Sequence, residues 1–155
     1  MLIFLSPKQK SADVKIHCVN LESSVPDFEF DFNNEKNAVS EFSQPLKYLY
    51  LPNNSVLKSG AFNTVADRLK LRKLHANSHF YTSNELVTDF PGRVLQIDLI
   101  DSKMIKKGEK FNIVSKNYPL SPDDIKKKYK ISDGGKTYLI FTQTQKGKII
   151  LRSIE

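Results

Sequence analysis

At 155 residues the chain is long enough to bury a core of its own, as one domain or as two small lobes. Its single cysteine excludes an internal disulfide and a metal site built from several cysteines, which agrees with a reducing cytoplasm. Only four apolar residues follow Met1 before the first polar one, with no basic stretch ahead of them. We therefore expect a cytoplasmic protein without a signal peptide or a membrane span at this end.

Positive charge is concentrated in the last third of the chain. Residues 1–100 contain 11 Lys and Arg and 11 Asp and Glu, whereas residues 101–155 contain 13 and six, so the whole net charge of +7 belongs to that segment. Such an excess on a small lobe favours an anionic partner, through neutralisation of phosphates and release of counterions. The alternative is a lysine-rich surface that only keeps the protein in solution.

Two patterns of period two predict an antiparallel hairpin near the N-terminus. Apolar and polar residues alternate over residues 14–18 and again over residues 28–32, and residues 21–27 connect the two strands. Cys18 lies on the apolar side, so we interpret it as a core thiol and not as a nucleophile. His17 lies on the polar side and is expected at the surface.

Helices and a central strand are predicted next. Ala38, Val39 and Phe42 are spaced for a short helix within residues 34–44, which Pro45 closes. Residues 46–51 are apolar on both faces, which predicts a central position in a sheet. A longer helix should begin after Pro52, with capping candidates at residues 53–55, and run to about residue 71. Its apolar stripe consists of Leu57, Ala61, Val65 and Leu69.

The remaining segments predict a polar connection, a turn and a second lobe. Residues 72–83 form the connection, and residues 90–93 form a turn in which glycine permits a positive φ. A strand at 93–100 follows. Further strands are expected at 111–116, 137–144 and 148–154, and the last two form a hairpin whose turn contains Gly147.

One helix in this lobe has a clear start signal. Ser121 is a capping residue, proline occupies the first helical position, and Asp123 and Asp124 suit the positive end of the helix dipole. The helix should run to about Lys130 and end at residues 133–135. We expect the two aspartates to pair with Lys127 and Lys128, one turn later.

Neither a metal site nor a catalytic set is predicted. His75 and His79 have the spacing of two ligands on a helix, but the residues between them are not helical and a third ligand is missing, so hydrogen bonding in a loop is favoured. Residues 133–136 follow a helix instead of preceding one, so we interpret them as a helix stop and not as a phosphate loop.

Three segments, 51–62, 73–83 and 89–93, resemble the C-terminal portion of a bacterial family of predicted S-adenosylmethionine-dependent methyltransferases. In that family a methyltransferase core is followed by a small ferredoxin-like piece and a THUMP-like domain. The resemblance implies an α+β protein of two small lobes, with mostly antiparallel sheets and one or two helices in each. The lobes would be a ferredoxin-like or linking lobe at 1–92 and a basic THUMP-like lobe at 93–155. It also implies RNA as the substrate class, because THUMP modules in related enzymes bind RNA.

The methyltransferase domain itself is not recognisable in this chain. Such a domain needs a strand followed by a glycine-rich turn that lets the backbone approach the cofactor. The six glycines here include no Gly-x-Gly. We therefore interpret the chain as a fragment that opens on a strand cut from a preceding domain, and expect S-adenosylmethionine only in the missing catalytic domain.

The resulting prediction is a non-catalytic, RNA-binding region that packs on a methyltransferase domain of the same chain. Tyr118 and Tyr129 would stack an occasional base. The predicted RNA-binding residues are Arg93, Lys103, Lys106, Lys107, Lys110, Lys126, Lys127 and Lys130.

Two alternatives stay open. One is a scaffold that docks on the methyltransferase domain without binding RNA, through an apolar patch in residues 1–50 that includes Phe4, Phe28, Phe30 and Phe32. The other is a free-standing enzyme, which would need a deep pocket with converging titratable side chains. The sequence predicts no oligomeric state.

Overall fold

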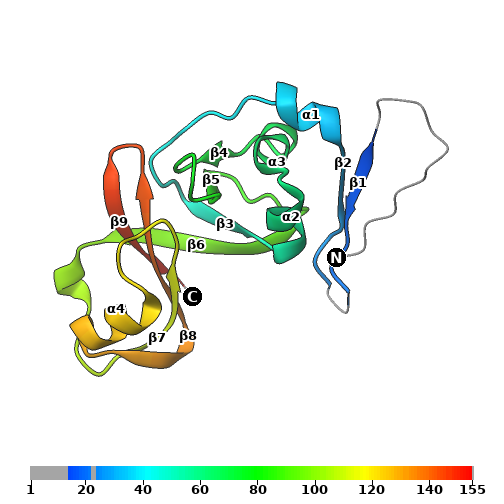
Figure 1. The fold of residues 1–155 in the computed structure, drawn as a ribbon. Coiled ribbons are helices and arrows are strands. Elements are labelled where there is room, and N and C mark those ends of the chain that lie inside the picture. The colour runs from blue at the N-terminus through cyan, green and yellow to red at the C-terminus, as the bar shows by residue number, and fades with distance from the viewer. Residues whose placement is uncertain (1–13, 22–23, 155) are drawn as a thin grey trace.

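The computed structural model describes residues 14–21 and 24–154. The predictions made for residues 1–13, an opening strand, no signal peptide and an exposed Phe4, lie outside this range. The described chain is a mixed α+β structure with mostly antiparallel pairing (Figure 1). Its elements are β1 (Lys15–Cys18), β2 (Phe28–Asp31), α1 (Phe32–Asn37), β3 (Tyr48–Pro52), α2 (Asn54–Ser59), α3 (Phe62–Arg68), β4 (Arg72–Lys73), β5 (Tyr81–Ser83), β6 (Gly92–Ile100), the 3-10 helix η1 (Ser102–Met104), β7 (Lys110–Ser115), α4 (Pro122–Tyr129), β8 (Ser132–Thr144) and β9 (Gly147–Ser153).

A seven-stranded sheet has the strand order β4-β5-β3-β6-β9-β8-β7. It connects two halves of the molecule: the first half comprises the described residues up to β5, and the second half comprises those from η1 onward. β6 is the shared strand, because its residues 92–96 pair with β3 and its residues 97–100 pair with β9 (Figure 1). β3 lies between β5 and β6, so its predicted central position is confirmed. β7 and β8 are parallel, and α4 makes the crossover between them, a connection that the sequence did not predict. The lobe boundaries 1–92 and 93–155 stay predictions, since β6 belongs to both halves.

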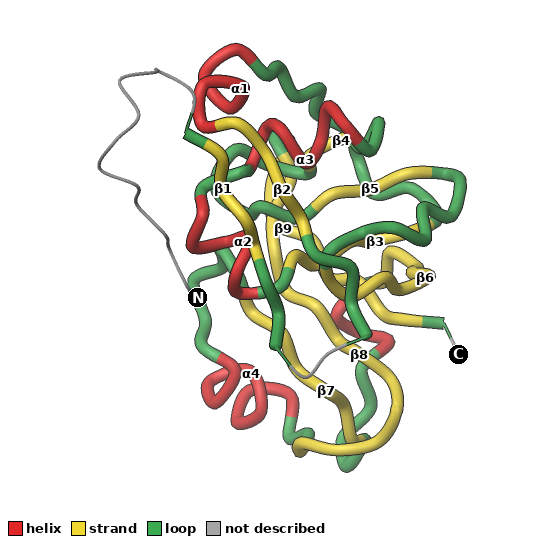
Figure 2. Tube along the Cα trace, turned by 90° about the vertical axis from the view of Figure 1, so that its right-hand side faces the viewer, coloured by secondary structure: helices red, strands yellow, loops and turns green. Residues whose placement is uncertain are grey.

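The N-terminal hairpin is confirmed as a separate two-stranded antiparallel sheet. It lies at one end of the molecule in Figure 1 and faces the viewer in Figure 2. Cys18, Phe28 and Phe30 are buried in the core of the first half, and burial raises the pKa of the Cys18 thiol. Cys18 is therefore a core thiol, as predicted. The apolar patch expected from Phe28 and Phe30 is wrong, because both rings face this core, while Phe32 is exposed.

The helix predicted within residues 34–44 is wrong in its bounds, since α1 ends at Asn37 and Val39 is exposed. No side chain of α1 is buried. The helix is held instead by Glu35, whose carboxylate accepts hydrogen bonds from the backbone N–H groups of Asn63 and Thr64 at 2.8 and 2.7 Å. This polar contact satisfies free N–H groups at the start of α3. The spacing of apolar residues in the sequence does not predict such a contact.

The long helix predicted after Pro52 is two short helices. Gly60 ends α2 in the left-handed conformation (φ 78°), which glycine adopts without strain, and α3 begins two residues later. Asn53 is the cap of α2, because its side chain accepts from the N–H of Val56. The stripe thus predicted Val65 on the buried face of α3, but neither the buried residues of α2, which are Ser55 and Val56, nor the break between the helices.

Glycines also correct two turn assignments. Gly92 does not adopt a positive φ; it begins β6, where a Cβ would lie 2.2 Å from the carbonyl oxygen of Leu51, so it permits close approach of β3. Helix α4 ends with Lys130 (φ 55°) as its C-terminal cap, so its predicted extent to about Lys130 is confirmed, whereas the stop expected at residues 133–135 is wrong. Gly134 and Gly135 lie inside β8, next to the shift in its register with β7. The predicted hairpin at Gly147 is confirmed.

The polar connection at residues 72–83 contains the short strands β4 and β5, which the sequence missed. It also contributes Leu74 and Phe80 to a core cluster that lies between the two halves, together with Leu49 of β3 and Ile97, Ile140 and Leu151. Hydrogen bonds join the β8–β9 hairpin to the first half, from Gln44 Nε2 to Thr144 Oγ1 (3.3 Å) and from Ser78 Oγ to the Gln143 carbonyl (3.2 Å). The halves are therefore packed on each other.

Across residues 14–21 and 24–154, no helix combines the length and the apolar character needed to cross a membrane.

Candidate nucleic-acid interface

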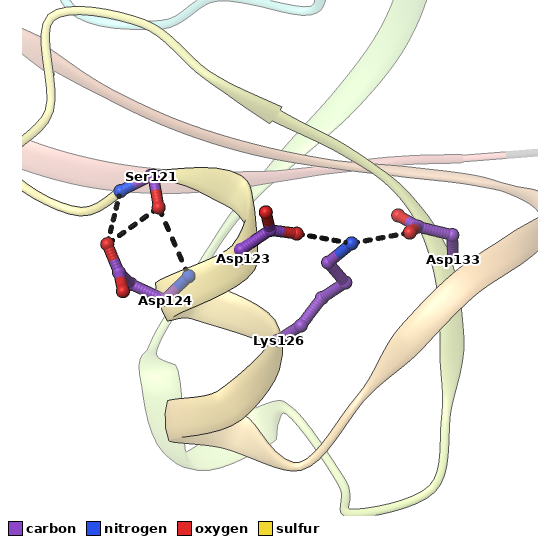
Figure 3. Close-up of polar contacts among 5 residues, drawn as sticks. All are labelled: Ser121, Asp123, Asp124, Lys126 and Asp133. Carbon is purple, nitrogen blue, oxygen red and sulfur yellow. Dashed lines mark hydrogen bonds and ion pairs between the residues drawn. The ribbon is translucent and has the colours of Figure 1, made fainter.

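Helix α4 and its C-terminal cap carry three of the predicted RNA-binding lysines, Lys126, Lys127 and Lys130. Ser121 Oγ accepts from the N–H of Asp124 (3.2 Å), and the Asp124 carboxylate accepts from the N–H of Ser121 (3.3 Å), which is a complete capping box (Figure 3). The Ser121 hydroxyl donates to the same carboxylate and lowers the pKa of Asp124. Ile125 is fully buried beneath the helix. The predicted start of α4 is confirmed.

The two predicted ion pairs of α4 are wrong. Asp124 is engaged by the cap, so it does not pair with Lys128. Asp123 pairs with Lys126 at 2.7 Å, one residue earlier than Lys127. The ammonium of Lys126 also contacts Asp133 on β8 at 2.6 Å, so it bridges the helix to the sheet (Figure 3). The hydrogen bonds that Lys126 donates to Asp123 and then to Asp133 raise its pKa.

Arg93 and Lys110 are also predicted RNA contacts, and both lie on the sheet. The guanidinium of Arg93 is 4.7 Å from the ring centroid of Tyr138 and donates to the Tyr138 hydroxyl. Since Arg93 is at the start of β6, it lies roughly 25 Å along the strand from the loop that follows β6. Lys110 begins β7 at the other end of that loop. Arg93 is thus separated from the lysines of the loop and helix.

The loop 101–109 and the end of α4 lie against each other. The N–H of Gly108 donates to the carbonyl of Lys130 (2.9 Å), and the N–H of Ser132 donates to the carbonyl of Glu109 (3.1 Å). These bonds place the lysines of the loop beside those of the helix. The six exposed lysines of the two segments, which we call the lysine end, are Lys103, Lys106, Lys107, Lys127, Lys128 and Lys130. None of them is in an ion pair with a described residue.

An open groove of about 600 Å³ lies next to the lysine end, between α4 and the strands β6 and β9. Tyr118 and Tyr129 line it, and both rings pack on Phe141, at 5.4 and 5.7 Å between centroids, so their positions are fixed. The groove is lined by Leu99, Ile100, Asp101, Ser102, Tyr118, Lys128, Tyr129, Lys148, Ile149 and Ile150.

Sequence reasoning named the two tyrosines but missed Leu99 and Lys148 as members of this groove. These residues are brought together because the end of β6 pairs with the start of β9, from Ile100 opposite Ile150. The sequence pattern does not reveal Leu99, because it lies on the same face of β6 as the buried Ile97 and is nevertheless 62% exposed in the structure.

The two histidines lie in the loop between β4 and β5, at the contact between the two halves. Nδ1 of His75 accepts from the N–H of Asn77 (3.0 Å) and lies 3.0 Å from the side-chain amide of Asn117. The ring of His79 stacks on Phe62 at 3.6 Å. Burial, followed by the charges of Lys73 and Lys116, lowers the pKa of His79 to about 4, so the ring is neutral at pH 7.

Titratable groups also gather around Phe62, but in the interior of the first half. Lys73 is 4% exposed and donates to Asn63 Oδ1 (3.3 Å), and burial lowers its pKa. The hydroxyl of Tyr81 donates to the Phe62 carbonyl, and burial raises its pKa. None of these groups lines the groove beside α4. Within the described ranges, no three His, Cys, Asp or Glu side chains are grouped so as to hold a metal ion.

Comparison with known proteins agrees with this architecture. Residues 48–91 match the model of a ferredoxin-like domain, and residues 93–152 match the model of a THUMP domain-like family. The crystal structure of a putative methyltransferase from Porphyromonas gingivalis W83 is similar, with 36% sequence identity and a TM-score of 0.76. The similarity covers 92% of this chain and 38% of that protein. No curated protein matches the sequence. The chain is thus a mixed α+β protein in which a ferredoxin-like domain is followed by a THUMP-like domain.

Proposed function

We propose that this chain is the RNA-recognition region of an S-adenosylmethionine-dependent methyltransferase, and that RNA contacts the lysine end of its THUMP-like domain. THUMP domains are commonly RNA-binding, and the similar Porphyromonas gingivalis protein is called a putative methyltransferase. The observation that carries the proposal is the set of six exposed lysines without carboxylate partners among the described residues, on two segments that are hydrogen-bonded together. Each ammonium is available to a phosphate and releases a counterion when it binds.

Methyl transfer is assigned to a part of the protein outside this similarity, because 62% of the Porphyromonas gingivalis protein has no counterpart here. The described residues do not fit S-adenosylmethionine. The only adjacent glycines, Gly134 and Gly135, lie within β8 against Lys110, and neither follows a strand to open a helix. This chain would therefore present the RNA, and the cofactor would bind the catalytic domain.

A titration of the chain with a structured RNA hairpin at about 50 and 200 mM salt tests the proposal. We expect binding at low salt and a loss of affinity of about 10²- to 10³-fold at the higher salt, since up to six phosphates are neutralised. Absence of binding at low salt by a folded chain, or an affinity that ignores salt, contradicts it.

A docking scaffold that binds no RNA is the second candidate. The observation in its favour is the exposure of Phe32, Val39 and Phe42, which lie on α1 and in the segment after it at 47%, 80% and 46%. Large apolar side chains exposed in this way suit contact with another domain. A folded chain that fails to bind RNA, but associates with the separately expressed methyltransferase domain, would select this function instead.

A further inference from the structure

We infer that the groove between α4 and the β6–β9 strands holds one unpaired nucleotide of the RNA, while the lysine end contacts the backbone around it. This inference rests on the proposed function. It goes further by separating two contacts: a general one with phosphates, and a local one that only a base outside a duplex can make.

The size of the groove suits a ligand of nucleotide dimensions. Its volume of about 600 Å³ lies within the roughly 300–1,000 Å³ of small-molecule sites. A paired base is stacked inside its helix and cannot enter, whereas an unpaired base is free to leave the stack. The groove opens beside Lys128, which also belongs to the lysine end, so a chain held there can place a base in it.

The walls offer an apolar and aromatic surface to a base. Leu99 is 62% exposed on its strand, and Tyr118 and Tyr129 are held in place by Phe141. Stacking on rigid side chains of this kind contributes about 1–3 kcal/mol for each base, whatever its identity. Because the tyrosine rings are fixed before binding, little side-chain entropy is lost when a base enters.

The charges fit a nucleotide better than a bare phosphate. Lys128 on α4 and Lys148 on β9 stand on different walls, and neither is in an ion pair with a described residue. Asp101 also lines the groove; one of its carboxylate oxygens accepts from the N–H of Lys103 at 2.8 Å, which leaves the second oxygen as an acceptor. A carboxylate repels a compact anion, but it accepts hydrogen bonds from the hydroxyl and amino groups of a nucleoside. A nucleotide meets both requirements if its phosphate lies near Lys128 and Lys148 and its sugar and base lie near Asp101.

Two RNAs test the inference: a blunt hairpin and the same hairpin with a short single-stranded extension. Affinity is measured by fluorescence anisotropy at low salt for the whole chain and for two variants of the groove, Leu99→Ser and Lys148→Gln. The matched controls are Leu86→Ser, an exposed leucine of the ferredoxin-like domain, and Lys146→Gln, an exposed lysine in the β8–β9 turn.

We expect the extension to tighten binding by wild type about 5- to 100-fold, as stacking of one base predicts. Leu99→Ser and Lys148→Gln should reduce that gain at least several-fold without changing the affinity for the blunt hairpin, and the controls should retain it. If both RNAs bind equally, or if the groove variants keep the gain, the groove inference is overturned and the proposed function stands. If neither RNA binds the wild type, the proposed function itself fails.

Discussion

The two domains use their positive charges differently. In the ferredoxin-like half, three cations contact partners in the same half: Lys73 is buried and hydrogen-bonded, Arg72 pairs with Glu41 at 3.2 Å, and Lys70 pairs with Asp67 at 3.5 Å. In the THUMP-like half, Lys126 forms ion pairs with Asp123 and Asp133, whereas the six lysines of the lysine end form no ion pair with a described residue. Paired charges stabilise a structure locally, whereas unpaired charges on one surface are available to a partner. The net charge of +7 in residues 101–155 therefore corresponds to a surface of unpaired lysines, the lysine end.

The largest expected effect breaks the strand that both domains share. Gly92→Ala would place a Cβ 2.2 Å from the Leu51 carbonyl oxygen and 2.8 Å from the Pro52 Cα, which are backbone atoms of β3 that cannot move alone. We expect a loss of about 3 kcal/mol or more in the free energy of unfolding, measured by urea denaturation.

Gly108→Ala is the matched control. Gly108 has a φ of 88° but no atom within 4 Å of an added Cβ, so the cost should be only about 1 kcal/mol of backbone strain. An equal effect of the two substitutions would refute the close-approach explanation for Gly92.

Reversal of charge at the lysine end should have the next largest effect. The triple variant Lys106→Glu, Lys107→Glu and Lys130→Glu should weaken binding of a structured RNA at low salt by about 100-fold, because three attractions become repulsions. The same change at Lys36, Lys47 and Lys58, which are exposed lysines of the first half, alters net charge equally and should weaken binding by less than about fivefold. Comparable losses in both variants would mean that net charge, and not this surface, determines binding.

Titration of His79 should give an effect of about 1–2 kcal/mol at the contact between the halves, after allowance for its partial exposure. The pKa is about 4 in the folded chain and 6.5 in the unfolded one, so the unfolded chain binds more protons between these values. Stability supplied by the neutral ring is complete above about pH 6.5 and is lost as the pH falls toward 4. In urea denaturation at pH 7 and pH 4.5, wild type should therefore lose more stability than His79→Gln. Equal losses would exclude a lowered pKa.

The smallest expected effect concerns the helix that presents the lysines. Ser121→Ala removes the acceptor for the Asp124 N–H, and should reduce the free energy of unfolding by about 1 kcal/mol. Ser43→Ala is a suitable control, since Ser43 Oγ donates to the neighbouring Gln44 carbonyl and caps no helix. Thermal denaturation followed by circular dichroism measures both, and an undiminished melting temperature for Ser121→Ala would show that the capping box contributes nothing.

Local signals predicted the elements that depend on local physics. The start of α4 at Ser121, the hairpin at Gly147 and the central strand at 48–52 each follow from capping, turn or burial preferences that a few neighbouring residues express. The break at Gly60 was in the sequence, but the regular apolar stripe across it outweighed the glycine. Strands of two and three residues, such as β4 and β5, are too short for periodicity to reveal.

Features that depend on distant contacts were not predictable. The capping of α3 by Glu35 joins residues 28 and 29 positions apart, and the bridge from Lys126 to Asp133 depends on where β8 passes α4. The candidate groove likewise combines β6, β9 and α4, with Leu99 and Lys148 far apart in the chain. Composition located the charge within residues 101–155, whereas only the fold distinguishes Lys126, which is neutralised by carboxylates, from the exposed lysines around it.

The salt dependence of RNA binding tests the central claim most directly when wild type is compared with Lys106→Gln, Lys107→Gln and Lys130→Gln. Affinity for one structured RNA hairpin is measured over a series of salt concentrations, and the slope of log affinity against log salt counts the phosphates neutralised. We predict that the variant has a slope smaller in magnitude by about two to three, roughly one for each lysine removed. An identical slope in the two proteins would show that these lysines do not contact RNA, and would contradict the account.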